Sequence, residues 1–155
     1  MALYYFDSSA IVKLYLDEPG TEQVIRLASS TSGNQIATSV LTRVEIRSAI
    51  SRKARRNEIE VADAGQAVEL LEEHWKTRFV RQPVSDSILD QACLLLDRHG
   101  LRAYDGIQLA SCLALNRTVS SGSGSVVFVC SDTHLSDAAA AEGLVCLDPE
   151  ESADE

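Results

Sequence analysis

The sequence has no long run of apolar residues, and this absence excludes one class of protein. The 155 residues are 45% apolar and 24% charged, which is typical of a folded globular domain. No apolar run approaches the roughly 20 residues that a membrane-spanning helix requires. The opening segment also lacks the basic residues that begin a signal peptide, so we expect a cytoplasmic protein. The length suits one domain and is too short for two ordinary ones.

Cysteines and histidines in metal-binding or disulfide spacing are also lacking. The sequence has no C-x-x-C pair, and its four cysteines lie far apart in apolar segments: Cys93, Cys112, Cys130 and Cys146. A zinc site or a disulfide framework needs closer or clustered spacing, so we expect buried free thiols. The three histidines show no zinc-ligand spacing either.

Net positive charge is absent from the chain as a whole but not from every part of it. The formal net charge is -9, and residues 148–155 hold five acids and no base. The segment 43–56 is the opposite, with the single acid Glu45 and six basic residues: Arg43, Arg47, Arg52, Lys53, Arg55 and Arg56. A lone charge run is usually a solvated helix end. Beside a cluster of acids it becomes a candidate contact for nucleic-acid phosphates.

What the sequence does contain is an alternation of short apolar runs with helical patterns. We expect strands near residues 3–6, 35–38, 80–84, 126–130 and 144–147. Helices are expected over about residues 8–16, 21–28, 39–56, 61–79, 85–99, 101–116 and 132–142. Strands joined through helices form a parallel sheet, so we predict one α/β domain with helices on both faces of its sheet.

Four acids stand where strands give way to helices. Asp7 follows the first strand, and Asp132 follows the fourth. Glu45 lies in the helix after the second strand, and Asp105 opens a later helix. The carboxyl ends of parallel strands meet at one edge of a sheet, where open α/β sheets bind ligands. We therefore expect the four carboxylates to lie at that edge.

Each acid also has a purely structural interpretation. Asp132 could cap its own helix, and Asp105 fits a capping box with Gln108. Glu45 falls within an apolar stripe that includes Val44, and could swing out of it toward a basic neighbour. Asp7 is hardest to explain as a cap, because the two serines behind it could cap the same helix.

Considered jointly, the four carboxylates suggest a metal site. Like charges crowded at one edge repel each other, and a divalent cation is the usual remedy. Mg²⁺ takes oxygen ligands and keeps several waters, so a few carboxylates and a substrate phosphate suffice. Such a site can orient a water, lower its pKa and stabilise charge on a phosphodiester.

The order and content of four segments resemble the PIN-domain ribonucleases: Tyr5–Tyr15, Val44–Ile46, Leu101–Ala110 and Val127–Leu135. In length and motif style the chain is most similar to the VapC toxins of toxin–antitoxin pairs. The resemblance implies a three-layer α/β/α sandwich around a parallel sheet of about five strands. It places a PIN domain over residues 1–148, and we expect residues 149–155 to form a frayed acidic tail.

The resemblance also implies an endoribonuclease that depends on Mg²⁺ or Mn²⁺, forms a homodimer and has a cognate VapB-type antitoxin. Its metal ligands and catalytic residues would be Asp7, Glu45, Asp105 and Asp132. Ser9 matches a small polar position that supports the first acid. The chain departs from the family pattern at Cys130, where a threonine is common. The Ser/Gly loop before the fourth strand is also longer than usual.

Two other interpretations stay open. A non-catalytic PIN-like module could bind RNA or a partner protein, although four acids set against RNA would gain it nothing. A phospho-accepting α/β domain would need an adjacent acid pair after the first strand and a lysine on a late strand end. The last lysine is Lys76, which disfavours this interpretation. Under the ribonuclease hypothesis, the basic residues of segment 43–56 steer the RNA backbone.

Overall fold

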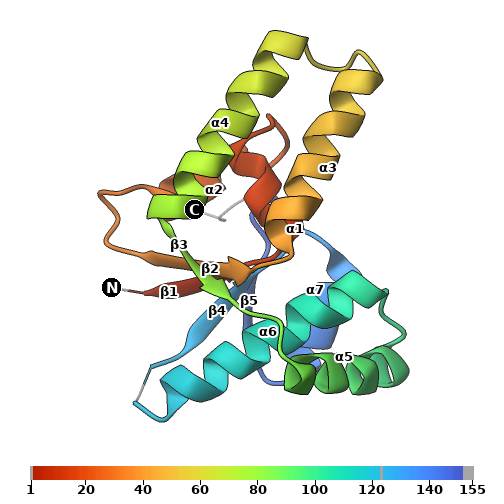
Figure 1. Cartoon of the computed structure of the whole chain (residues 1–155). Helices are drawn as coiled ribbons and strands as arrows, with labels where there is room; N and C mark the ends of the chain where they lie inside the picture. Colours follow the sequence, from red (N-terminus) through yellow and green to blue (C-terminus); the bar gives the residue numbers. More distant parts are fainter. Residues whose placement is uncertain (1, 123, 152–155) are drawn as a thin grey trace.

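The computed structural model describes residues 2–122 and 124–151 of the chain. At its centre lies a parallel sheet of five strands in the order β3-β2-β1-β4-β5 (Figure 1). The strands are β1 (Leu3–Phe6), β2 (Gln35–Ser39), β3 (Phe79–Gln82), β4 (Val126–Val129) and β5 (Val145–Leu147). The predicted parallel sheet and its number of strands are confirmed.

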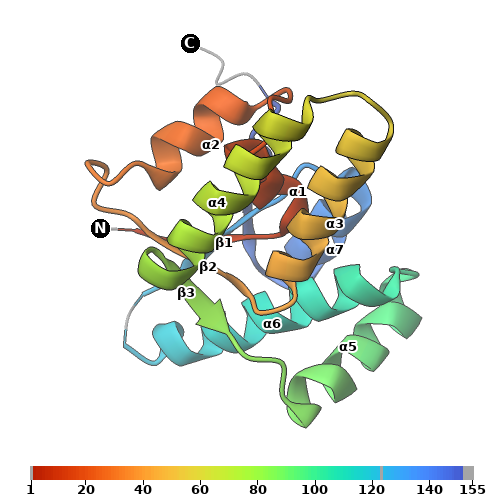
Figure 2. The ribbon, with the colours of Figure 1, turned by 45° about the horizontal axis from the view of Figure 1, so that its top comes forward.

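Helices cover both faces of this sheet (Figure 2). They are α1 (Ser8–Ile11) with its 3-10 continuation η1 (Val12–Leu14), α2 (Thr21–Ala28), α3 (Thr42–Arg55), α4 (Val61–Thr77), α5 (Asp86–His99), α6 (Ala103–Ser120) and α7 (Thr133–Ala141). Helix α6 runs past its predicted end, so the Ser/Gly loop is shorter than predicted. Within the described residues, no helix is both long and apolar enough to span a membrane.

The central strand β1 divides the apolar side chains between two cores. Successive strand residues point to opposite faces of a sheet. Tyr5 accordingly packs into the core formed with α5, α6 and α7, and Phe6 into the core formed with α1 to α4. Both side chains are fully buried. The three-layer α/β/α sandwich implied by the resemblance is thereby confirmed.

The sheet continues on both sides of β1, with β2 as its neighbour on one side and β4 on the other, and this topology positions the site. In the register of the sheet, Tyr4 of β1 lies beside Ile36 of β2 and beside Val127 of β4. Strand β3 extends one wing of the sheet and β5 the other. In an open α/β sheet, a crevice forms at the carboxyl ends of two neighbouring strands whose connections leave toward opposite sides of the sheet. Those ends are Phe6 and Val129, which are register partners.

The cysteines are less uniformly buried than their apolar neighbours predict. All four are free thiols, and Cys112 and Cys130 are buried. Cys146 is half-buried, whereas Cys93 is exposed. The expectation of burial is wrong for Cys93, because α5 packs against α6 and turns another face inward: Ile88, Ala92 and Leu95.

The segment after β5 packs against the domain. Pro149 is buried, and its carbonyl oxygen would lie 2.6 Å from a Cβ added at Gly20. Glu150 forms an ion pair with Lys13 at 2.8 Å. The expectation of a frayed tail is therefore wrong for the first residues after 148, whereas residues 152–155 lie outside the described part. The domain boundary at residue 148 stays a prediction.

Candidate active site

The four predicted acids line one cleft of about 810 Å³ at the carboxyl edge of the sheet. Asp7 directly follows β1, and Asp132 lies just beyond β4. Glu45 is in the first turn of α3, and Asp105 is in the first turn of α6. Their expected convergence at one edge is confirmed. Their roles in metal binding and catalysis stay predictions.

Asp7 forms the floor of the cleft, where it is 2% exposed. Its Oδ1 accepts hydrogen bonds from the Ser9 hydroxyl at 2.6 Å and the Ala10 backbone N–H at 3.1 Å. Its Oδ2 accepts one from the Cys130 thiol at 3.2 Å. Asp7 is therefore the cap of α1, and the argument that a serine would take that place is wrong. The serines lie inside the first turn, where their hydroxyls bind acids of the cleft.

Burial raises the pKa of Asp7 to about 6. The hydrogen bonds from Ser9, Cys130 and Ala10 favour the charged form and limit this rise, while the charge of Asp105 adds to it. A buried carboxylate with a like charge nearby is costly to ionise. A cation in the cleft would remove this cost, so the electrostatics of the floor favour a positively charged ligand.

Glu45 is held by donors from two other elements. The Ser8 hydroxyl donates to Oε2 at 3.0 Å, and the Gln108 amide donates to Oε1 at 2.9 Å. Burial raises the pKa of Glu45, the two hydrogen bonds oppose the rise, and the charge of Asp105 adds to it. The interpretation in which Glu45 swings toward a basic neighbour is wrong. Its carboxylate is fixed in the cleft instead.

The buried face of α3 also differs from the expected apolar stripe. Val44 is 68% exposed and lines the cleft. The buried residues are Thr42, Ile46 and Ile50. Helix α3 can bury Thr42 because its hydroxyl bonds to Thr38 at 2.7 Å and to the Gln108 amide at 2.9 Å. Because α3 turns Thr42, Ile46 and Ile50 inward, Val44 lies on an exposed side of the helix.

Gln108 is the residue that sequence reasoning most clearly misread. It was assigned to a capping box with Asp105, but α6 begins at Ala103, so the acid lies inside the first turn. Gln108 is buried beneath the cleft, where its amide donates to Glu45 and to Thr42. Its Oε1 accepts a hydrogen bond from the buried Tyr5 hydroxyl at 2.7 Å. This network ties α3, α6 and β1 together under Glu45.

Asp105 and Asp132 form the rim of the cleft. Burial and the charge of Asp132 raise the pKa of the half-buried Asp105, while Arg102 and His134 lower it. Asp132 is exposed, and its Oδ1 accepts the Leu135 backbone N–H at 3.0 Å. The structural interpretation of Asp132 as a cap is therefore confirmed, although the same side chain also lines the cleft.

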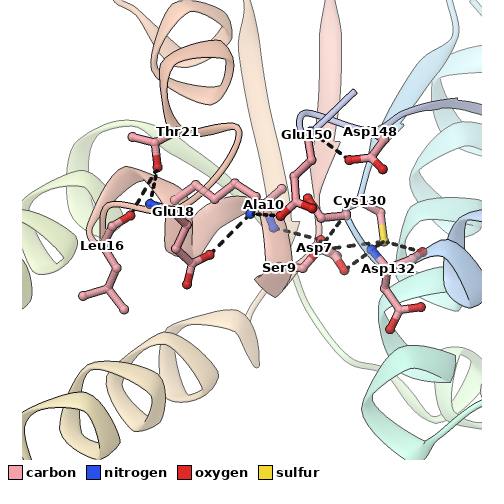
Figure 3. A network of polar contacts seen from close by, with 12 residues as sticks. Asp7, Ser9, Ala10, Leu16, Glu18, Thr21, Cys130, Asp132, Asp148 and Glu150 are labelled. Carbon is pink, nitrogen blue, oxygen red and sulfur yellow. Dashed lines mark hydrogen bonds and ion pairs between the residues drawn. The ribbon is translucent and has the colours of Figure 1, made fainter. Parts of the chain in front are cut away.

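Cys130 links the first acid to the fourth (Figure 3). Its Sγ donates to Asp7 and accepts the Asp132 backbone N–H at 3.3 Å. Burial and the neighbouring Asp7 charge raise the pKa of this thiol far above its ordinary value, so it stays a protonated donor. Ser9 supports the same connection, because its hydroxyl donates to Asp7 and accepts the Ser131 backbone N–H at 2.9 Å. The expected contact of Ser9 with the first acid is present.

The six predicted RNA-contacting residues are dispersed. Arg43 and Arg47 pair with Glu72 of α4, at 2.7 and 3.2 Å. Lys53 lies 3.8 Å from Glu58, and only Arg52 among the six lines the cleft. The remaining two, Arg55 and Arg56, are exposed where α3 ends.

The sequence reasoning also missed two charged residues that line the cleft and a third that pairs with one of them. Arg102 and Glu18 both line it. Lys13 lies beneath Glu18 and is only 2% exposed; it forms ion pairs with Glu18 at 3.3 Å and with Glu150. Figure 3 shows the two glutamates approaching from separate segments. Nothing local marks Lys13 as buried, because its partner Glu150 is 137 positions away.

The donors in the cleft suit a hard divalent cation. Four carboxylates supply oxygen ligands, which are the ligands that Mg²⁺ and Mn²⁺ prefer. In the part of the chain that the structure describes, no three His, Cys, Asp or Glu side chains are grouped closely enough to hold an ion by themselves. An ion in this cleft would therefore need water or substrate oxygens as further ligands, as is usual for Mg²⁺.

A five-stranded parallel sheet with carboxylates at its switch point has a clear counterpart among known families. The sequence model of the PIN domain matches residues 4–140, and the chain therefore belongs to the PIN domain family. It is 32% identical over 116 residues to the ribonucleases VapC45 and VapC49 of Mycobacterium tuberculosis, which covers 74% of this chain and 78% of each relative.

Solved structures with the same fold include toxin–antitoxin complexes. VapBC2 from Rickettsia felis, bound to a DNA fragment from its promoter, has a TM-score of 0.61 and 14% identity, covering 94% of this chain and 98% of that one. VapBC-1 from nontypeable Haemophilus influenzae has a TM-score of 0.59 and 17% identity, covering 96% and 99%. PAE2754 from Pyrobaculum aerophilum has a TM-score of 0.59 and 21% identity, covering 94% and 89%. At these identities the likeness shows a shared fold.

Proposed function

We propose that this PIN domain is a Mg²⁺- or Mn²⁺-dependent endoribonuclease that cleaves RNA phosphodiesters. The observation that carries the proposal is the single cleft lined by four acids from separate elements. Two relatives that share 32% of their aligned residues with this chain are named ribonucleases. The raised pKa of the buried Asp7 supports the same proposal, because an unneutralised carboxylate there is costly.

The ion would be held by Asp7 on the floor, by Asp105 and Asp132 on the rim, and by Glu45. When bound, such an ion lowers the pKa of a water ligand and takes up charge that develops on a phosphodiester. Glu45, fixed by Ser8 and Gln108, would orient the attacking water and accept its proton. A pKa raised by burial suits a general base near neutral pH.

We further propose that the chain is the toxin of a VapBC-type pair, a cytoplasmic homodimer neutralised by a VapB-type antitoxin. Support comes from relatives named VapC and from fold neighbours that were solved as VapBC complexes. Expression of the chain should arrest growth, and co-expression of a small adjacent reading frame should restore it. An adjacent frame with a DNA-binding start would match the proposed partner; arrest by Asp7→Asn as strong as by wild type would contradict the toxin mechanism.

Cleavage of RNA with Mg²⁺, with and without EDTA, tests the catalytic proposal. Wild type should cleave only with the metal, and Asp7→Asn should not cleave. Asp90→Asn, an exposed acid on α5, is the matched control and should cleave like wild type. Equal cleavage by wild type and Asp7→Asn would remove Asp7 from the reaction.

A non-catalytic PIN-like module that binds RNA or a partner is the alternative function. The dispersed arginines outside the cleft would suit such a module. A melt with increasing Mg²⁺ separates the two, because a ligand that binds only the folded state raises the melting temperature. Stabilisation by Mg²⁺ that Asp7→Asn abolishes favours the enzyme. Absence of both stabilisation and cleavage favours the module.

A further inference from the structure

Tyr104 is an exposed aromatic side chain on the rim of the acidic cleft. The chain has eight aromatic residues, and the other seven are buried or half-buried. Those seven all take part in ring contacts, as Tyr5 does with Phe128 and Trp75 with Phe79. Tyr104 is 58% exposed and, within the described residues, makes neither a ring contact nor a side-chain hydrogen bond. Its ring is therefore largely exposed where it lines the cleft.

The surroundings of Tyr104 indicate what could cover that ring. Arg102 lines the cleft two positions before it, and Arg52 lines the cleft from α3. Neither guanidinium belongs to an ion pair among the described residues, unlike Arg43 and Arg47. An exposed aromatic ring and guanidinium groups without acidic partners in one cleft are the combination that binds nucleic-acid strands, because the cations contact phosphates and the ring stacks on a base.

We infer that Tyr104 is a specificity-determining residue that stacks on one unpaired nucleobase of the RNA, while Arg52 and Arg102 contact flanking phosphates. This inference rests on the proposed ribonuclease function. In a duplex both faces of a base are covered by its neighbours, so only an unstacked nucleotide can offer a face to Tyr104. Asp105, next to Tyr104 in the chain, would then lie beside the backbone of the stacked nucleotide.

A protein segment is a less suitable occupant. The acids of the cleft would attract a basic segment, but Arg52 and Arg102, which also line it, would repel that segment. RNA suits both the basic and the acidic residues of the cleft, because its phosphates can pair with the arginines directly and with the acids through a cation. A basic peptide is therefore measured beside RNA as the competing ligand.

The test measures binding of a fluorescein-labelled 12-nucleotide single-stranded RNA to Asp7→Asn protein, which is expected not to cut it. Adding Tyr104→Leu should weaken binding by about 10- to 100-fold, the usual loss when a base loses an aromatic partner. Tyr104→Phe keeps the π-face and should stay within about twofold. Leu94→Ala removes an equally exposed side chain, 58% on α5, and should leave binding unchanged.

Abasic RNAs identify stacking directly. With the base removed at one position after another, the loss caused by Tyr104→Leu should disappear at the stacked position and persist elsewhere. Arg52→Gln and Arg102→Gln should each lower the salt dependence of binding by about 0.7 in the log–log slope. A blunt-ended, fully paired RNA duplex should bind without dependence on Tyr104.

Several results would overturn the inference. They are unchanged RNA binding by Tyr104→Leu, or the same loss on every abasic RNA. A third is a Tyr104→Leu variant that loses affinity for a basic peptide but keeps its affinity for RNA. Failure of the proposed function looks different. In that case wild type would not cleave RNA, or would cleave it as Asp7→Asn does, while the dependence of binding on Tyr104 persists.

Discussion

The floor and the rim of the acidic cleft are built in different ways. On the floor both oxygens of Asp7 are hydrogen-bonded, to donors from α1 and from the end of β4. On the rim Asp105 has no side-chain hydrogen bond within the described residues, and Asp132 uses one oxygen to cap α7. The floor is fixed before any ligand arrives, whereas the rim can adjust to one. Together with Glu45, which is also held by two hydrogen bonds, the site combines fixed carboxylates with adaptable ones.

The largest expected effect comes from changing the same functional group in both places. Asp7→Asn should lower kcat/KM for RNA by about 1,000-fold or more, because under the proposed mechanism it removes the fixed charge that would hold the metal ion. Asp132→Asn should cost only about 10-fold, because water can replace an exposed ligand. Single-turnover cleavage with saturating Mg²⁺ measures both. Equal losses would mean that floor and rim do not differ in function.

A smaller effect is expected beneath Glu45. Gln108→Leu removes the amide that binds Glu45, Thr42 and Tyr5, and should lower kcat/KM by about 10- to 100-fold. It should also lower the free energy of unfolding by about 1–3 kcal/mol, because buried hydroxyls lose their partners. Urea unfolding and cleavage assays measure the two changes. Gln66→Leu, at an exposed position of α4, is the control and should alter neither.

The thiol of Cys130 offers a finer test of the floor. Cys130→Val removes the donor to Asp7 and has the same shape as Cys130→Thr, and it should lower kcat/KM by about 10-fold. Cys130→Thr restores a hydroxyl donor and should recover most of that loss. If Val and Thr behave alike, the Cys130 hydrogen bond does not position Asp7.

The smallest expected effect is on stability without metal. Burial holds the folded-state pKa of Asp7 at about 6, above its usual value of 3.8. The stability that this group contributes is fully present below pH 3.8 and is lost as pH rises through about 6. From pH 5 to 7.5 wild type should lose about 1 kcal/mol relative to Asp7→Asn.

Urea unfolding in EDTA at both pH values measures this difference. Asp90→Asn, at its exposed site, should keep a constant difference from wild type between the two pH values. A difference between wild type and Asp7→Asn that does not change with pH would mean that the floor is not electrostatically strained.

The contrast between floor and rim also separates what the sequence could predict from what it could not. The strands and the acids at their ends are visible locally, because apolar runs and the turns that follow them are continuous in the chain. Asp7 and Asp132 could be placed at one edge for that reason. The identity of the cap was misjudged, because Asp7 and the serines behind it are equally good caps on sequence alone.

The supporting residues depend on contacts that no local pattern reveals. Gln108 is buried only because Tyr5, Thr42 and Glu45 from other elements satisfy its amide. The pairing of Arg43 with Glu72 depends on how α3 and α4 pack. Burying the Lys13 ammonium would be costly without the ion pair to Glu150, a residue that lies beyond β5. These are long-range consequences of the fold, and they decide which predicted residues can reach the cleft.

The central position of β1 sets an order of events during synthesis. Asp7 is made 123 positions before the Cys130 thiol that donates a hydrogen bond to it. Strand β4, the neighbour of β1 in the sheet, is made just before Cys130. Pairing between such distant segments waits until both have left the ribosome. Until Cys130 has been made, each nascent chain therefore carries Asp7 without the cleft that surrounds this acid in the folded domain.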